Sequence, residues 1–300
     1  TVRMDYDEKT GVWKASLTGG IVDGADLPVD AEFVSRFSGA KTEVMEYVNK
    51  PIGRFTKSIS TRDSMFKDSA FVDLIHEIQL ELTDADVSFA APLSLDAQIN
   101  EGDIYVRDMF NLYKYENLLY TMELTGGQID DFLEYSYGNW MDTMTGPQDQ
   151  LIRFKKDDSG NLVFNERYNS YDTVTRYYNY DSAAGIDYVV DVSAPEGDKV
   201  EILRFSDGAP FSESAAYEVA INSYRASGGG GHLTRGAGLD KEDIESATLG
   251  STDKDLRYYL MKWIENERVV TPAADDNWRV EPAEWASAGA AASYPMLYGE

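Results

Sequence analysis

The chain has 300 residues, a formal net charge of −26, no cysteine and two histidines, His76 and His232. The acid surplus leaves no excess of basic residues to neutralise phosphates, which argues against nucleic acid as a partner. Without cysteine there is no disulfide, thiolate nucleophile or cysteine-held metal, and two histidines cannot build a histidine-rich metal centre. No apolar run approaches the roughly 20 residues of a membrane span.

The N-terminal pattern predicts a hairpin followed by a helix. Residues 2–6 and 12–17 read as two short strands around a turn that ends in glycine. Asp30 is a suitable N-cap for an amphipathic helix over residues 33–48, which ends before Pro51. The sequence shows no initiator Met and no signal peptide, so we expect a mature or excised chain.

Helices and strands then alternate along the chain. Strands are predicted at residues 52–59, 86–91, 118–124, 186–192, 199–205 and 217–221, and helices at 69–82, 106–112, 126–138 and 253–268, with Thr125 and Asp253 as caps of the last two. The three strands over residues 186–221 have short connections, which favours a mixed or antiparallel sheet with packed helices, an α+β fold. Residues 286–300 are rich in alanine and glycine, and we expect a frayed tail.

A strand ending in Tyr224, Arg225 and the glycines 228–231 is the most distinctive stretch. Glycine lets a backbone approach a ligand closely. The spacing does not fit a phosphate-binding G-x-G-x-x-G, and Ser227 near His232 lacks the pattern around a hydrolase nucleophile. On these residues alone, a flexible loop after a strand is the favoured interpretation.

Two tyrosines stand at predicted strand ends. Tyr115 precedes a strand and lies two residues before Asn117, whereas Tyr224 follows a strand. Rings on two such loops, about 7 Å apart, could clamp a flat heteroaromatic ligand, and stacking contributes about 1–3 kcal/mol per base. The alternative, in which both are half-buried core residues, stays open and is favoured by the residues alone.

Several stretches together resemble the C-terminal domain of 5'-nucleotidases. These are residues 108–119, 123–134, 184–192 and 217–226. Residues 272–279, PAADDNWR, are similar to the branch of bifunctional 2',3'-cyclic-nucleotide 2'-phosphodiesterase/3'-nucleotidases. The resemblance covers roughly residues 50–285.

The resemblance implies a division of labour between two domains. In that family an N-terminal calcineurin-like domain holds two metal ions and the catalytic histidine, while the C-terminal domain sandwiches the base between two aromatic rings. It implies Tyr115 and Tyr224 as the rings and Asn117 as the amide beside the first. Asn222, Arg225 and Gly229 are looser candidates from the second loop.

The metal-binding motifs of the family are missing from this sequence. We therefore expect no cofactor in this chain and a divalent metal pair in an absent N-terminal domain. Residues 1–50 would be the tail of that domain plus a linker helix, and residues 51–285 the nucleoside- or nucleotide-binding domain. Asp96 stands where the 5'-specific branch places an arginine, which puts a phosphate contact there in doubt.

The expected function is substrate recognition within a periplasmic or extracellular nucleotidase or cyclic-nucleotide phosphodiesterase, with this chain alone inactive. A stand-alone binding or adhesion module with the same fold is the alternative. A metal-independent hydrolase that uses aspartate or glutamate is the third possibility.

Overall fold

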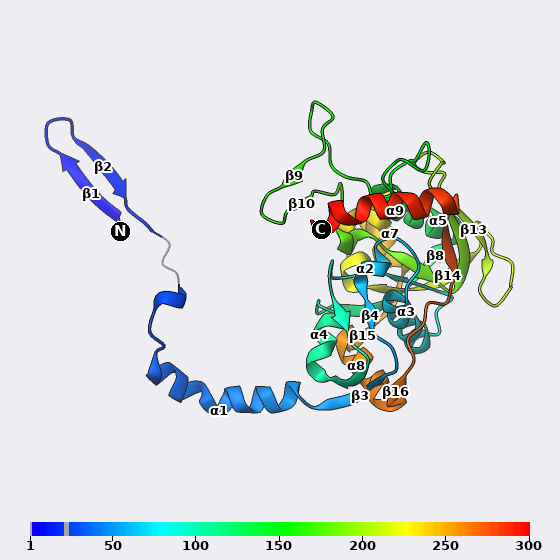
Figure 1. Cartoon of the computed structure of the whole chain (residues 1–300), viewed down its shortest axis with the longest axis horizontal. Helices are drawn as coiled ribbons and strands as arrows, with labels where there is room; N and C mark the ends of the chain where they lie inside the picture. Colours follow the sequence, from blue (N-terminus) through cyan, green and yellow to red (C-terminus); the bar gives the residue numbers. More distant parts are fainter. Residues whose placement is uncertain (1, 21–23) are drawn as a thin grey trace. The chain divides into compact units, whose positions relative to one another are not determined.

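The structure, a computed structural model, describes residues 2–20 and 24–300 and divides into two units, Thr1–Tyr47 and Val48–Glu300 (Figure 1). The first unit contains the predicted hairpin, β1 (Val2–Asp7) and β2 (Val12–Leu17), a short 3-10 turn η1 (Gly24–Asp26) and helix α1 (Ala31–Val48). The backbone N–H of Phe33 donates to Asp30 Oδ1 over 3.0 Å, so Asp30 caps α1 as predicted.

A five-stranded mixed sheet is the centre of the second unit, with strand order β11-β5-β14-β8-β15. Its strands are β5 (Val87–Ala90), β8 (Leu118–Thr125), β11 (Ser182–Ala184), β14 (Ala216–Asn222) and β15 (Thr248–Asp255). Strand β14 runs parallel to β5 and antiparallel to β8. The α+β fold with a mixed sheet is confirmed.

Smaller sheets surround this centre. One has the order β13-β12-β17, another β16-β3-β7, and β4 pairs with β6 and β10 with β9. Their strands are β3 (Pro51–Phe55), β4 (Ile59–Ser60), β6 (Gln98–Ile99), β7 (Gly102–Tyr105), β9 (Phe164–Asn165), β10 (Ser170–Tyr171), β12 (Ile186–Asp191), β13 (Val200–Phe205), β16 (Val269–Val270) and β17 (Trp278–Glu281).

The three strands predicted over residues 186–221 do not share one sheet. Strands β12 and β13 pair with each other, whereas β14 lies between β5 and β8. The reason is burial: the last four residues of β14, Val219 to Asn222, are all buried, as a central strand requires, while β13 alternates and stays at an edge.

Helices cover both faces of the central sheet. They are α2 (Thr61–Ser64), α3 (Ala70–Thr83), α4 (Met109–Leu112), α5 (Gly126–Trp140), α6 (Ser223–Ala226), α7 (Lys241–Ala247), α8 (Leu256–Glu267) and α9 (Ala283–Tyr298), with short turns η2 (Val106–Asp108), η3 (Tyr177–Asn179), η4 (Gly229–Gly231) and η5 (His232–Gly236). Along β14, Val219 and Ile221 belong to the hydrophobic cluster that contains α5 residues, and Ala220 to the cluster that contains α3 and α8 residues. None of the described helices is long and apolar enough to cross a membrane.

The predicted cap of α5 is confirmed and that of α8 is wrong. Thr125 Oγ1 accepts the backbone N–H of Gln128 over 3.2 Å, and Gln128 bonds back to Thr125. Helix α8 is capped by Asp255, whose side chain accepts the N–H of Tyr258. Asp253 instead accepts a hydrogen bond from the hydroxyl of Tyr259.

The C-terminal stretch expected to fray forms helix α9, so that expectation is wrong. Its small residues permit close packing: a Cβ at Gly289 would lie 2.8 Å from the methyl of Met144. Ser293 Oγ accepts the backbone N–H of Ile152 over 3.1 Å, and Leu297 is buried. The alanine and glycine residues here belong to a helix that packs closely against its neighbours. Composition alone does not distinguish such a helix from a frayed tail.

Candidate functional site

Tyr115 and Tyr224 lie at the ends of two neighbouring strands of the central sheet. Tyr115 precedes β8 and Tyr224 follows β14, and these antiparallel strands pair with Asn222 opposite Leu119. The backbone N–H of Leu118 also donates to Ser223 Oγ over 3.2 Å, which ties the two ends together. The register therefore brings together the two rings that the sequence places 109 positions apart.

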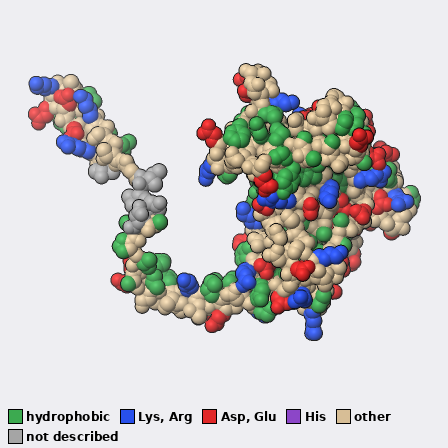
Figure 2. All heavy atoms as spheres, in the orientation of Figure 1, with side chains coloured by type: hydrophobic (Ala, Val, Ile, Leu, Met, Phe, Trp, Pro, Cys, Tyr) green, Lys and Arg blue, Asp and Glu red, His purple; other side chains and the backbone are tan. Residues whose placement is uncertain are grey.

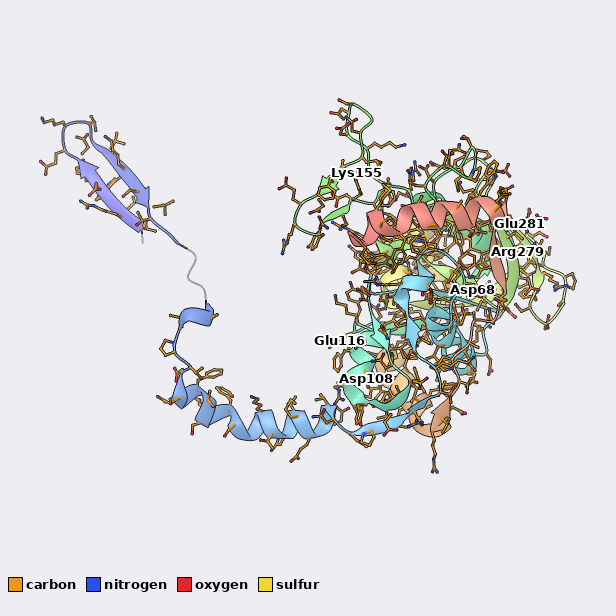
Figure 3. The ribbon with its side chains drawn as sticks, viewed as in Figure 1. Asp68, Asp108, Glu116, Lys155, Arg279 and Glu281 are labelled. Carbon is orange, nitrogen blue, oxygen red and sulfur yellow. The ribbon has the colours of Figure 1, made fainter. Side chains whose placement is uncertain are left out.

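Both rings are partly exposed. Tyr115 is 37% and Tyr224 44% exposed. Partial burial, and then the neighbouring phenols of Tyr178 and Tyr224, raise the pKa of Tyr115. Each of the two predicted rings thus keeps a surface that a ligand can reach. Glu116, the next residue in the sequence, is exposed at the surface of the second unit (Figure 3).

Tyr178 is a third ring at this site, and sequence reasoning did not single it out. It lies in η3, and its ring centroid is 6.4 Å from that of Tyr115 at an interplanar angle of 77°. Tyr177 packs edge-on against Tyr178 at 5.4 Å. The density of tyrosine over residues 141–181 was a signal, but that segment has no periodicity from which to place its side chains.

Gly229 lies against the ring of Tyr224. A Cβ at this position would stand 2.6 Å from Cδ2 and Cε2 of Tyr224 and 2.4 Å from its carbonyl oxygen. On the side of Arg225, the guanidinium carbon is 5.2 Å from the Tyr224 ring centroid. Most of the glycine run forms the turn η4, and its first residue, Gly229, packs against the ring of Tyr224.

Arg225 is buried, with 1% of its side chain exposed. It donates to both carboxylate oxygens of Asp181, over 2.7 and 2.9 Å, and to the carbonyl of Tyr178 over 2.7 Å. A further bond reaches Asn179 Oδ1 over 3.1 Å, and another the carbonyl of Gly229 over 3.2 Å. With its donors engaged in this way, Arg225 supports the site from behind and does not face a ligand.

The two asparagines of the prediction have different surroundings. Asn222 is 5% exposed, and its Oδ1 caps α6 by accepting the N–H of Arg225 over 3.0 Å. Asn117 is half-buried at the sheet edge, where its Nδ2 is 3.4 Å from the hydroxyl of Tyr113 and its carbonyl accepts the N–H of Leu256. Asn117 therefore lies two residues after Tyr115, and Asn222 caps the short helix that carries Tyr224.

The histidines do not form a metal site. Burial lowers the pKa of both His76 and His232 to about 3, so both are neutral. His76 bonds Ser88 and Ser182 through its two nitrogens, and His232 packs 4.8 Å from the ring of Phe132. This environment fits structural histidines and not the ligands of a dinuclear centre.

One group of three carboxylates has oxygens close enough to hold a cation among the described residues. It comprises Asp68, Asp73 and Asp275, with ligand atoms within 4.8 Å of one another. Burial and mutual repulsion raise the pKa of Asp68 to about 6 and that of Asp73 to about 9. Asp73 also accepts the N–H of Asp275, and Asp68 that of Asp276, so these carboxylates hold residues 275–276 in place.

A family comparison defines the class of the protein. The model of the 5'-nucleotidase C-terminal domain matches residues 51–235, which is more than half of the chain. The chain belongs to the 5'-nucleotidase C-terminal domain family.

Individual proteins with similar sequences are longer than this chain. The chain is 26% identical to the trifunctional nucleotide phosphoesterase protein YfkN of Bacillus subtilis, over 94% of this chain and 20% of YfkN. It is also 26% identical to a 2',3'-cyclic-nucleotide 2'-phosphodiesterase/3'-nucleotidase of Salmonella typhimurium, over 84% of this chain and 41% of that protein. The chain thus spans less than half the length of either relative.

Solved structures agree with the fold. A Staphylococcus aureus protein assigned to the 5'-nucleotidases superposes with a TM-score of 0.68 at 18% identity, over 93% of this chain and 49% of that one. A 5'-nucleotidase precursor from Thermus thermophilus gives 0.59 at 17% identity, over 92% and 48%. At these identities the likeness shows the fold alone.

Proposed function

We propose that this chain recognises the nucleoside part of a nucleotide for a metal-dependent phosphoesterase domain that lies outside residues 1–300. The base would stack between Tyr115 and Tyr224, with the amide of Asn117 available at its edge. The observation that carries this proposal is the pair of partly exposed rings at the adjacent ends of β8 and β14. The names of the longer relatives, which include a cyclic-nucleotide phosphodiesterase, support the substrate class.

The supporting residues give the clamp its rigidity. Gly229 leaves room for the ring of Tyr224, and Asn222 fixes the start of α6, on which that ring stands. Arg225 and Asp181 join α6 to the segment that carries Tyr178, the neighbour of Tyr115. The buried ion pair thus links the helix that carries Tyr224 to the segment whose Tyr178 packs against Tyr115, and this link would help to hold the spacing of the clamp before a ligand arrives.

The hydrolytic step does not follow from these residues. A dinuclear site needs metal ligands that leave an open position for water and phosphate, and the two histidines here are buried, neutral and engaged in packing. The cluster of Asp68, Asp73 and Asp275 consists of carboxylates that already bind backbone N–H groups. A periplasmic or extracellular location belongs to the same proposal, and detection of the parent protein in periplasmic extract or culture medium would test it.

Calorimetric titration with adenosine and with adenosine 2',3'-cyclic phosphate tests the clamp. Replacing Tyr115 or Tyr224 by Ala should weaken binding by about 5- to 150-fold, because stacking contributes about 1–3 kcal/mol per base. Tyr47→Ala is a matched control, since Tyr47 is 57% exposed on α1. Absence of nucleoside binding, or equal affinity in all three variants, would refute the proposal.

A further inference from the structure

A cavity of about 390 Å³ lies beside Tyr177, the ring that packs on Tyr178. Tyr177 is part of its wall, and Tyr177 packs on Tyr178, which packs on Tyr115. Burial, and then the phenols of Tyr115 and Tyr178, raise the pKa of Tyr177, and Tyr168 acts in the same direction. The ring contacts from Tyr115 through Tyr178 to Tyr177 form a continuous aromatic chain from the clamp to the cavity.

The cavity lies where β10 and the end of α9 come side by side (Figure 1). Figure 2 shows hydrophobic side chains gathered around the C-terminal half of α9. Tyr168, Tyr171, Tyr177 and Tyr298 supply aromatic walls, and Ser170 and Thr173 line it as well. Its volume falls in the range of small-molecule sites, about 300–1,000 Å³, and its mixture of rings and hydroxyls suits a second base with its sugar.

Two arginines line the cavity, and they differ in their partners. Arg62 is held by both oxygens of Asp96, over 2.8 and 2.7 Å, and by Glu300. Arg176 has no ion pair among the residues that the structure describes. It is exposed, lines the cavity and directly precedes Tyr177 in the sequence. An arginine in this position can bind a phosphate oxygen.

We propose that this cavity is a second nucleoside subsite, so that the domain binds dinucleotides with one base in the clamp, the other in the cavity and the linking phosphate at Arg176. This inference rests on the proposed clamp and names a larger substrate class for it. A mononucleotide would leave the cavity to water, whereas a dinucleotide would gain stacking against its tyrosines.

Calorimetry of the full chain separates the two sites with three probes: adenosine, adenosine 3'-monophosphate and adenylyl-(3'→5')-adenosine. The dinucleotide should bind at least about tenfold more tightly than the monophosphate, because a second stacked base contributes about 1–3 kcal/mol. The double variant Tyr168→Ala/Arg176→Gln should remove this advantage and leave the affinity for adenosine unchanged. Both side chains are exposed, so the fold should survive, and the melting temperature checks that.

Lys155→Gln is the matched control, since Lys155 is an exposed cation of the same segment that does not line the cavity (Figure 3). Equal affinity for the dinucleotide and the monophosphate would overturn the second subsite while adenosine binding still supports the clamp. A dinucleotide advantage that persists in the double variant would also overturn it. If adenosine does not bind, the clamp fails, and the second subsite fails with it.

Discussion

Arg225 and Asp181 form a buried, two-pronged ion pair, with Nε to Oδ2 at 2.7 Å and Nη2 to Oδ1 at 2.9 Å. Their side chains are 1% and 0% exposed. Burial opposes the ionised form of Asp181, but Arg225 holds the pKa of that carboxyl below its usual value. Since the pair joins α6 to the segment before β11, it couples the position of Tyr224 to that of Tyr178.

Removing one partner of this pair should be costly for the fold. Asp181→Ala leaves a buried guanidinium without its counter-charge, and we expect the free energy of unfolding to fall by about 3–5 kcal/mol. Urea denaturation measures the loss. Asp103→Ala, which breaks the pair with Arg54 at 59% exposure on both sides, should cost about 0–1 kcal/mol. Similar losses in both variants would contradict the anchoring role.

Gly229→Ala should damage the site more than the fold. The new methyl group would overlap the ring and the carbonyl of Tyr224, so the ring must move, and nucleoside affinity should fall by about tenfold or more, as expected when one stacking face is displaced. Titration with adenosine measures this affinity.

Gly250→Ala is the control and should keep the wild-type affinity, because no atom lies within 4 Å of the added Cβ. Wild-type affinity in Gly229→Ala would show that Gly229 does not set the position of the Tyr224 ring.

The isolated chain should have no phosphoesterase activity. Its histidines are buried, and its carboxylate cluster binds backbone N–H groups, so neither supplies an open metal position. Assays with adenosine 2',3'-cyclic phosphate, in Mn²⁺ and in EDTA, should give the rate of the buffer alone. Turnover that persists in EDTA would instead support a metal-independent hydrolase, with Asp73→Asn as the first variant to examine.

The sequence predicts that Tyr115 and Tyr224 lie at strand ends, but it does not predict that these two strand ends are adjacent in the fold. Alternating residues fix β8 and β14, so Tyr115 and Tyr224 could be placed at strand ends. The register that puts Asn222 opposite Leu119 depends on long-range packing. The pattern also led to a mistaken sheet for β14, because short connections do not reveal that a strand is inserted between two others.

The burial of polar side chains is the second feature that could not be predicted from the sequence. Arg225 stands next to a tyrosine and four glycines, and in sequence this resembles a ligand-binding loop. Its counter-charge, Asp181, lies in an irregular segment, so nothing local indicates that the guanidinium is enclosed. Tyr178 was missed for the same reason, since its place depends on the backbone that Arg225 holds.

The buried acids Asp68 and Asp73 should make the protein less stable as the pH rises. The pKa of Asp73 is raised to about 9 and that of Asp68 to about 6, whereas an unfolded aspartate has a pKa of about 3.9. Between these values the two acids bind more protons in the folded state than in the unfolded state, so their contribution to the free energy of unfolding falls as the pH increases from about 5 to about 9. The buried histidines, whose pKa is lowered to about 3, act in the opposite direction below about pH 6.5, so the fall is clearest between pH 7 and pH 9.

Urea unfolding at pH 5, 7 and 9 measures this slope. We expect a loss of a few kcal/mol over the range, because one pKa unit corresponds to about 1.4 kcal/mol. Asp73→Asn should flatten the profile, since the amide oxygen can still accept the N–H of Asp275 but carries no charge to repel Asp68. An exposed control, Asp103→Asn, should keep the wild-type slope. If Asp73→Asn also keeps the wild-type slope, repulsion between Asp73 and Asp68 is not the cause of the pH dependence.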